Sequence, residues 1–545
     1  PAERAGEIAA LLAAADAAAA AHHFLHWELA FPEVFFDAAG RPRPDGGFDA
    51  VIGNPPYVRQ ERIQPVKPFL AARYAVYSGT ADLFLYFYER GLTLLKPEHR
   101  LGYITSGTFM NSNSAKPFRK YIHENAGLEW VANFGENQPF KGAEMVYPTI
   151  TVMRRGGAKE TFRNYFMAET VSRLRMGEIF AEAQWRNASS NVTELDEWRF
   201  QTADTTAVFR KITQGFQTLS NVLNDAIYYG IKTGLNDAFI VDTPTRNRLI
   251  AEDSRSAEII KPLVRGEDLR PWYQIDSGEH LIFKAYLERF RSRLEPKPPT
   301  WDAKQGEWQG RKAGSYRWYE IQDNVAYHQE FALPKLFVPD IAKLPRFSFD
   351  ETGKLCNDKG TIIRASSAVL GLLNSRPLWF VLSQIATPLR LRAGLWQYQA
   401  KLQFVERLPI PPLTADQESS LAALAEEITG IARARYGLHE AFRRRLRADL
   451  GEGAKLNTAL ESWWMLEFAV LRKEAVKAFK RDVPLNQRDE WEGYLADQRA
   501  RHRDQTAQIM ALETRLNQIV YQAFHLTPDE IALIETATQY PYGEV

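Results

Sequence analysis

Four consecutive residues, Asn54-Pro55-Pro56-Tyr57, combine a side-chain amide, two prolines and an aromatic ring. The prolines fix φ and remove two backbone donors, so the Asn54 amide oxygen and the Pro55 carbonyl become preset acceptors. Adenine carries an exocyclic amine whose lone pair is delocalised into the ring. Two acceptors can bind both amine hydrogens and orient the nitrogen for methylation, while Tyr57 stacks on the base. The tetrapeptide therefore suits the binding of a planar amine.

The apolar run over residues 48–53 predicts a buried strand that ends in this rigid loop. A second interpretation is a strand-end turn in which Pro55 and Pro56 merely stiffen the chain. The segments around the loop favour the chemical interpretation.

Residues 26–35, HWELAFPEVF, and residues 48–61, FDAVIGNPPYVRQE, resemble adenine-N6 DNA methyltransferases. More narrowly, they resemble the methylase and specificity portions of single-chain type IIG-like restriction-modification enzymes. Later segments follow the order of that family, with a helix expected from residue 81, a strand over 101–105, a helix over 118–122 and a strand over 147–153. The resemblance thus covers most of the chain.

The resemblance implies an α/β fold, with the C-terminal half of a doubly wound Rossmann-like methyltransferase sheet. It assigns catalysis to Asn54, Pro55, Pro56 and Tyr57, with S-adenosylmethionine as the cofactor. It also implies that an aromatic residue before the strand at 147–153 packs on the flipped base. By position this residue is Phe140, with Phe134 as the second choice.

The cofactor-binding part is not visible before Asn54, where the resemblance implies a strand, a Gly-rich turn and an acidic residue. The chain starts at Pro1, and the residues before the loop are too few for the βα units that the family order requires. Two explanations remain: a longer polypeptide with the cofactor site upstream of Pro1, or a second chain that supplies it. The missing initiator methionine favours the first.

Three regions are expected along the chain. Residues 1–215 alternate helix and strand and form the catalytic domain, and residues 216–412 form an α+β target-recognition domain with short strands and turns. Residues 413–545 form a helical C-terminal region.

Double-stranded DNA is the expected partner, although the net charge is only +1, because local positive patches bind phosphates. Basic and aromatic residues interleave between Lys297 and Tyr319, a mixture suited to phosphates and unstacked bases. The alternative is a solvated face. The candidate DNA contacts are Lys232, Arg265, Arg311, Lys312, Arg317 and Trp318.

The 545 residues include one cysteine, Cys356, which permits no intrachain disulfide and indicates a reducing, cytoplasmic compartment. We expect no metal site, because the ten histidines have no ligand spacing. No membrane partner is expected, because no apolar stretch is long enough to cross a bilayer. The Ala-rich residues 9–21 predict a helix. No nuclease motif is found, so a nuclease would belong to another domain or subunit.

Taken together, the sequence predicts a site-specific DNA adenine-N6 methyltransferase of a restriction-modification or related phage-defence enzyme, which flips its target adenine. Two alternatives remain open. One is a catalytically silent DNA-recognition module of a defence complex, and the other is a protein glutamine methyltransferase, since the same loop can grip a planar amide.

Overall fold

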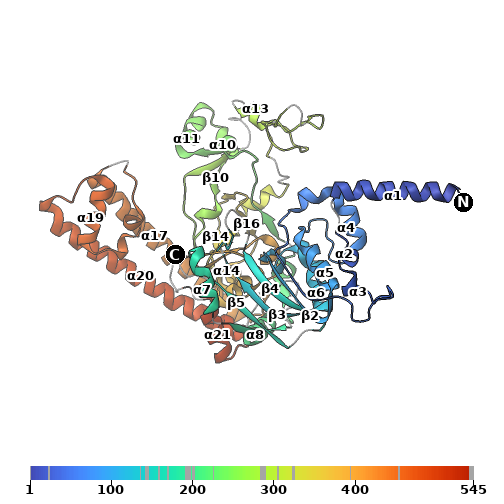
Figure 1. Ribbon diagram of the computed structural model, residues 1–545. Helices are drawn as coiled ribbons and strands as arrows, with labels where there is room; N and C mark the ends of the chain where they lie inside the picture. The colour runs from blue at the N-terminus through green and yellow to red at the C-terminus, as the bar shows by residue number, and fades with distance from the viewer. Residues whose placement is uncertain are drawn as a thin grey trace. The chain divides into compact units, whose positions relative to one another are not determined.

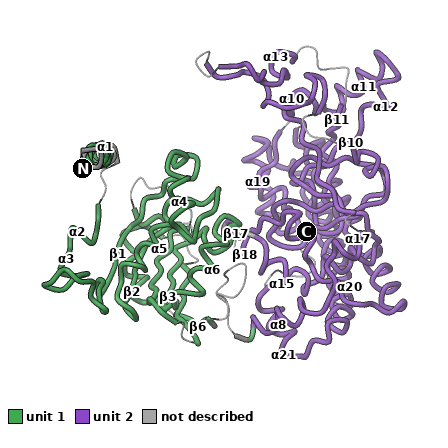
Figure 2. Tube along the Cα trace, turned by 90° about the vertical axis from the view of Figure 1, so that its right-hand side faces the viewer, with its two compact units in different colours: residues 1–204 green, residues 205–545 purple. Residues whose placement is uncertain are grey.

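The computed structural model contains two compact units, Pro1–Asp204 and Thr205–Val545, which are coloured separately in Figure 2. The structure describes residues 2–22, 25–135, 137–140, 147–157, 160–167, 171–183, 185–190, 198, 203–224, 226–282, 290–302, 306–321, 326–392, 395–451, 454–538 and 540.

Unit 1 is built on a six-stranded sheet with the order β1-β2-β4-β3-β5-β6. Its strands are β1 (Phe48–Gly53), β2 (Leu95–Ser106), β3 (Ala126–Asn133), β4 (Pro148–Arg155), β5 (Thr161–Phe166) and β6 (Arg186–Ser189). β1 and β2 are parallel, and β4 lies antiparallel between β2 and β3. β1, β2 and β3 therefore run in the same direction and end at the same edge of the sheet.

Helices cover both faces of this sheet (Figure 1). On one face, α5 (Phe84–Leu94) and α6 (Lys116–Asn125) bury a core against β2, β3 and β4 that includes Leu101, Val131 and Met153. On the other face, α7 (Arg173–Ala181) packs against Ala132 and Ile150. Successive strand residues point to opposite faces, so β3 contributes to both layers. The remaining helices of the unit are α1 (Ala2–His22), α2 (Trp27–Ala30), α3 (Pro32–Phe35) and α4 (Lys67–Arg73).

The apolar run before the tetrapeptide Asn54-Pro55-Pro56-Tyr57 forms strand β1, as predicted, but the expectation that it is buried is wrong. Ile52 is 86% exposed, and no residue of β1 is fully buried. Among the described strands, β1 pairs with β2 alone. An edge strand leaves one side of its backbone and part of its side-chain surface uncovered, and the apolar sequence alone does not reveal this position.

Other elements of unit 1 agree with the sequence. The predicted Ala-rich helix is α1, the predicted strands at 101–105 and 147–153 lie in β2 and β4, and the predicted helix at 118–122 lies in α6. The helix expected from residue 81 begins at Phe84 as α5. Among the helices of the described residues, none is both long and apolar enough to cross a membrane.

Unit 2 contains several small sheets. One has the order β15-β10-β11-β9, the second β14-β12-β16-β8 and the third β13-β18-β17, while β19 pairs with β7. The strands are β7 (Gln217–Thr218), β8 (Ile227–Tyr229), β9 (Ile240–Asp242), β10 (Ile260–Val264), β11 (Glu279–Ile282), β12 (Lys335–Pro339), β13 (Ile341–Ala342), β14 (Ser348–Asp350), β15 (Leu355–Cys356), β16 (Gly360–Ile363), β17 (Thr387–Arg392), β18 (Leu395–Gln399) and β19 (Pro409–Ile410). The predicted short strands and turns after residue 225 are confirmed.

Short and long helices complete unit 2. The shorter ones are α8 (Ala203–Thr213), which begins at the unit boundary, α9 (Leu219–Val222), α10 (Asn236–Phe239), α11 (Thr243–Glu252), α12 (Ser256–Ile259), α13 (Arg291–Leu294), α14 (Ser367–Leu373), α15 (Arg376–Ile385), α16 (Leu402–Val405), α18 (Thr458–Glu461), α19 (Phe468–Phe479) and α21 (Pro528–Thr538). The long helices α17 (Ala415–Leu450) and α20 (Arg488–Ala523) pack together.

Thr414 caps α17 through a capping box with Gln417, which fixes where this helix begins. Apolar residues of α17 and α20, such as Leu421 and Leu516, share one core with residues of the second sheet, such as Leu336. The recognition region and the helical region predicted from the sequence therefore share a core. The division into three domains stays a prediction.

Candidate active site

Three loops leave the sheet of unit 1 at the edge where β1, β2 and β3 end. Asn54 follows β1, Ser106 ends β2, and Phe134 follows β3. The Gly107 N–H donates to the Tyr147 carbonyl at 2.9 Å, and the Phe134 N–H donates to the Pro148 carbonyl at 2.8 Å. The carboxyl edge of parallel strands is where α/β sheets place their ligands, so this edge is the first place to look for a site.

Tyr57 joins the loop after β1 to strand β2. Its hydroxyl lies 2.6 Å from Asn54 Oδ1 and 2.8 Å from the Ile104 carbonyl oxygen, and it can donate its single hydrogen to either acceptor. Burial of the ring raises the pKa of the Tyr57 hydroxyl to about 12, so this donor keeps its hydrogen at neutral pH. Asn54 is exposed and Pro55 is buried. The tetrapeptide is therefore anchored by Pro55 and Tyr57, while the Asn54 amide faces solvent.

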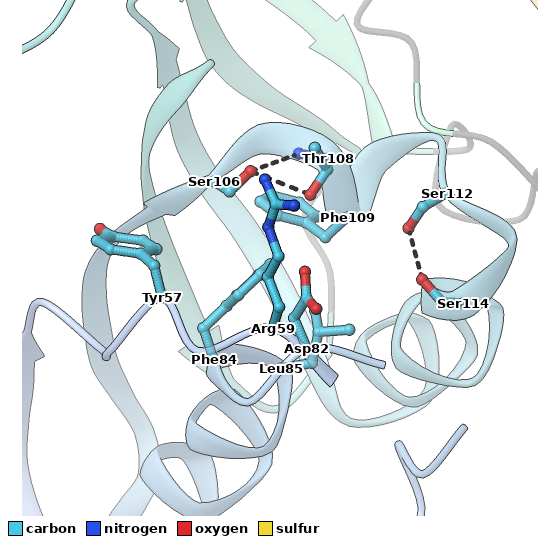
Figure 3. A pocket seen from close by; sticks show the side chains of 10 residues that line it. All are labelled: Tyr57, Arg59, Asp82, Phe84, Leu85, Ser106, Thr108, Phe109, Ser112 and Ser114. Carbon is cyan, nitrogen blue, oxygen red and sulfur yellow. Dashed lines mark hydrogen bonds between the residues drawn. The ribbon is translucent and has the colours of Figure 1, made fainter. Parts of the chain in front are cut away.

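A pocket of about 300 Å³ lies beside Tyr57 at this edge. Figure 3 shows the side chains that line it, which come from the loop after β1, the start of α5, and the segment that follows β2. They are Tyr57, Arg59, Asp82, Phe84, Leu85, Ser106, Thr108, Phe109, Ser112 and Ser114. The lining combines aromatic and apolar walls with several polar groups, the usual composition of a small-ligand site.

Asp82 ties the loop after the tetrapeptide to the start of α5. Its carboxylate accepts a hydrogen bond from the Gln60 N–H at 3.1 Å, and the neighbouring Leu83 N–H donates to the Val58 carbonyl at 3.0 Å. Burial raises the pKa of the Asp82 carboxyl, and the nearby Glu61 charge adds to that rise. Lys67 donates to the Gln60 side-chain oxygen at 2.7 Å. The loop is thus held from two sides.

Beneath the pocket, a buried hydroxyl network fixes the end of β2. The Tyr88 hydroxyl lies 2.9 Å from Thr105 Oγ1 and 2.7 Å from Thr151 Oγ1. At the next turn, a Cβ on Gly107 would lie 2.5 Å from Thr149 Oγ1 and 2.9 Å from the Tyr147 carbonyl oxygen. Only glycine allows this close approach of the segment after β2 to the start of β4.

The two aromatic candidates for stacking on a base have different surroundings. Phe134 is 7% exposed and stacks on Phe180 with ring centroids 5.7 Å apart, so it belongs to the core beneath α7. Phe140 is 39% exposed. A residue that stacks on an incoming base needs an available ring face, and of the two candidates Phe140 is the more exposed; its stacking role stays a prediction.

The predicted DNA contacts of unit 2 differ in exposure and in the partners that their side chains already have. Arg311 is 4% exposed, and its guanidinium donates to the backbone carbonyls of Leu294, Thr233, Glu320, Arg317 and Trp318. Arg265 forms an ion pair with Glu279. Lys232, Lys312 and Arg317 are exposed, and Trp318 is half-buried beneath the Arg291 guanidinium. Arg311 thus organises the basic-aromatic segment, and the DNA contacts of the exposed cations stay a prediction.

The sequence reasoning did not single out several pocket residues, namely Arg59, Asp82, Ser106, Thr108, Ser112 and Ser114. Two signals were available. Arg59 lies two positions after Tyr57 in the quoted motif, and Ser106 ends a strand that was predicted from the sequence. Asp82 and the serines reach the pocket through tertiary packing, which leaves no local pattern.

The single cysteine and the acidic and histidine residues suggest no further chemistry in the described part of the chain. Cys356 is fully buried, and burial raises the pKa of its thiol well above the ordinary value. A protonated, inaccessible thiol is a packing residue. Within the described ranges, no group of three or more His, Cys, Asp or Glu residues could hold a metal ion.

Two separate segments of the chain match protein-family models. Residues 7–140, which include the tetrapeptide, match the family described as Eco57I restriction-modification methylase. Residues 414–520, which include α17 and α20, match a domain of unknown function, DUF8810.

Individual relatives extend the similarity over most of the chain. The type II methyltransferase M.XhoI of Xanthomonas vasicola is 28% identical over 444 residues, which is 73% of this chain and 76% of the relative. The type II methyltransferase M.PaeR7I of Pseudomonas aeruginosa is 26% identical over 430 residues, covering 72% and 71% of the two chains.

A solved structure shares the fold. The type IIL restriction-modification enzyme MmeI, determined in complex with DNA, aligns with a TM-score of 0.52 at 13% identity. The alignment covers 90% of this chain and 57% of that one. The mixed α/β fold is thus similar to that of a restriction-modification enzyme. The chain is related to the restriction-modification methyltransferases that carry a recognition portion, and the resemblance predicted from the sequence is confirmed.

Proposed function

We propose that this chain carries the substrate half of a site-specific DNA adenine-N6 methyltransferase that takes its methyl group from S-adenosylmethionine. The observation that carries the proposal is the position of Asn54-Pro55-Pro56-Tyr57. The tetrapeptide directly follows a strand at the carboxyl edge of the sheet, next to a pocket of about 300 Å³. Relatives named as type II methyltransferases support DNA as the substrate.

The loop would activate the amine by accepting its two hydrogens. Asn54 Oδ1 has two lone pairs, so it can accept one hydrogen from Tyr57 and another from the adenine amine. The Pro55 carbonyl would accept the second amine hydrogen. With both hydrogens held, the lone pair of the amine nitrogen would point towards the methyl carbon that it is to receive. S-adenosylmethionine would supply the electrophilic methyl group: the carbon–sulfur bond breaks, the nitrogen–carbon bond forms, and the amine then releases one proton.

The target adenine would leave the duplex and stack between Tyr57 and Phe140. Flipping costs a few kcal/mol, and each base–aromatic contact contributes roughly 1–3 kcal/mol. Two such contacts therefore suffice to offset the cost. The partial exposure of Phe140 supports this role, because the ring is accessible to a base.

The residues that hold the cofactor would lie outside the described part of unit 1. Among the described residues of unit 1, no strand is followed by a Gly-rich turn that leads into a helix and could cradle the cofactor. The uncovered side of β1 supports this view. Its free backbone edge and the 86% exposed Ile52 would be covered if a further strand, upstream or in a second chain, extended the sheet. We therefore assign no residue of this chain to the cofactor.

Sequence recognition would be the task of residues 216–412. The exposed Lys232, Lys312 and Arg317 are suited to phosphate contacts. In a restriction-modification or related defence enzyme, this region would select the DNA sequence in which the adenine is methylated.

The test compares Asn54→Ala with a matched control, Asn125→Ala, in the full-length protein. Asn125 ends α6 just before β3 begins, at the opposite edge of the sheet, and among the described residues its exposed side-chain amide bonds only to the Tyr121 carbonyl. We expect Asn54→Ala to abolish methyl transfer from radiolabelled S-adenosylmethionine to DNA, while a gel shift shows sequence-specific binding largely intact. Normal methylation by Asn54→Ala would overturn the assignment.

The same experiment separates the alternatives. Label in a protein glutamine rather than in DNA adenine would identify a protein methyltransferase. Sequence-specific binding without any methyl transfer by the wild-type protein would identify a silent recognition module. Nucleoside analysis of the labelled DNA confirms whether N6-methyladenine is the product.

A further inference from the structure

Arg59 lines the pocket, and its charge interacts with the Asp82 and Glu61 carboxylates without a direct contact. It lies two residues after Tyr57, in extended backbone just before a short 3-10 helix (Gln60–Val66). Within the described part of the chain, its guanidinium forms no hydrogen bond and no ion pair. In the same unit, Arg90 and Arg100 pair with Glu28 and Glu129. An arginine that lines a cavity with its donors unused is available for a ligand.

The neighbouring carboxylate does not occupy these donors. Asp82 also lines the pocket, but the bond that it makes is to the Gln60 N–H. Figure 3 shows the Arg59 side chain extending past Asp82 towards Ser106 and Thr108. The guanidinium therefore reaches the hydroxyl side of the pocket.

Four serine and threonine hydroxyl groups line the same pocket. Ser106 Oγ lies 3.0 Å from Thr108 Oγ1, and Ser114 donates to Ser112 Oγ at 3.2 Å. Hydroxyls can redirect their hydrogens, so each can turn towards a bound acceptor. A guanidinium with several hydroxyls is the donor set that proteins use for oxyanions.

We propose that Arg59 binds a backbone phosphate of DNA next to the target adenine, with Ser112 and Ser114 as further donors. This inference rests on the proposed function, because the tetrapeptide beside Arg59 defines which nucleotide enters. A nucleotide that enters the pocket brings its flanking phosphates with it. Arg59 is exposed to solvent, the side from which a DNA backbone arrives. The carboxylate of the methyl donor is the other oxyanion at hand, but that donor also carries a sulfonium charge that a guanidinium repels.

A phosphate clamp at this position would hold the extruded nucleotide without reading sequence. It would act together with base stacking to keep the base out of the duplex, while other residues choose the site. Loss of Arg59 should therefore weaken binding to DNA of every sequence, and it should reduce the dependence of binding on salt.

The test uses Arg59→Gln and Arg59→Lys in the full-length protein, with Arg62→Gln as the matched control. Arg62 is an exposed arginine of the same segment that does not line the pocket. We expect the slope of log binding constant against log salt to fall in magnitude by about 0.9 in Arg59→Gln, the value for one phosphate. Arg59→Lys should retain most of the slope. Arg62→Gln should keep the wild-type slope and the wild-type sensitivity to a neutral phosphate next to the target.

The second arm places a single neutral methylphosphonate on either side of the target adenine. It should weaken binding by wild type on the order of 10-fold, the loss of a charge-assisted contact, and should leave Arg59→Gln unaffected. An unchanged salt slope with equal sensitivity of both proteins to the methylphosphonate would overturn the proposal. A loss of S-adenosylmethionine affinity with intact DNA binding would also overturn it, in favour of the donor carboxylate. Neither arm needs turnover, so failure of the methyltransferase assignment is seen separately, in the Asn54→Ala experiment.

Discussion

The Tyr57 hydroxyl lies 2.6 Å from Asn54 Oδ1 and 2.8 Å from the carbonyl oxygen of Ile104 in β2. One side chain thereby links the residue proposed to bind the amine to the neighbouring parallel strand. The asparagine is exposed and follows an edge strand, so its orientation depends on this link and on the buried Pro55.

Tyr57→Phe tests the link while keeping the ring that would stack on a base. The variant loses one hydrogen bond, worth about 1 kcal/mol, so we expect the rate of methyl transfer to fall about fivefold with little change in DNA affinity. Single-turnover methylation and a gel shift measure the two effects. Tyr77→Phe is the control, because Tyr77 lies in the same unit outside the pocket lining. A rate equal to that of wild type would show that Asn54 is oriented without Tyr57.

Asp82 should support the loop through its acceptor oxygen rather than through its charge. Asp82→Asn keeps an oxygen for the Gln60 N–H, whereas Asp82→Ala leaves that N–H without its partner. An unsatisfied, partly buried donor costs about 1–3 kcal/mol. We therefore expect Asp82→Ala to lose stability and methylation rate, and Asp82→Asn to stay close to wild type in both. Denaturant unfolding and methylation assays measure these effects, and equal losses in the two variants would point to a role for the charge.

Phe140→Ala should weaken base flipping while preserving duplex binding. The variant removes one stacking contact, worth roughly 1–3 kcal/mol. Fluorescence of 2-aminopurine at the target position reports extrusion, because the base brightens when it unstacks, and we expect a smaller increase in the variant. Phe134→Leu is a useful comparison, since Phe134 packs in the core against Phe180. Loss of fluorescence in Phe134→Leu alone would move the stacking role to that residue.

The local sequence predicts strands and loops better than it predicts the exposure of their side chains. The strand at 48–53 and the loop after it were predictable, because an apolar run followed by two prolines has few alternatives. The exposure of Ile52 was not, because an apolar residue on an edge strand has the same sequence as one in the middle of a sheet. The local sequence pattern determines whether a segment forms a strand. Residues elsewhere in the chain determine which strands it pairs with and how much of it is buried.

Arg311 and Asp82 show the same limit at the level of side chains. Arg311 stands among aromatic residues, which favours nucleic-acid binding, yet carbonyls as distant in sequence as Thr233 take up its donors. Asp82 looked like an ordinary helix-start residue, and its contact with Gln60 joins positions that are separated by a whole helix. The tetrapeptide was identifiable because all of its chemistry is local. The rest of the pocket depends on tertiary contacts.

The pH dependence of stability should reveal the histidine pair between α17 and α20. His439 and His502 both stack on Trp464, with ring centroids 3.9 and 4.9 Å away. Burial lowers the pKa of His502 to about 4, helped by the Arg435 charge, and lowers the pKa of His439 to about 2. In the unfolded chain both histidines titrate near the ordinary value of about 6.5.

Between about pH 6.5 and about pH 4, the unfolded chain therefore binds more protons than the folded one, so stability falls as the pH falls. We expect the thermal midpoint of the helical signal to drop between pH 7 and pH 5, and His502→Gln to reduce this drop because one of the two protonation sites is gone. His525→Gln, which changes an exposed histidine, is the control and should keep the wild-type drop. An identical drop in wild type and His502→Gln would mean that this stacked histidine does not cause the acid sensitivity.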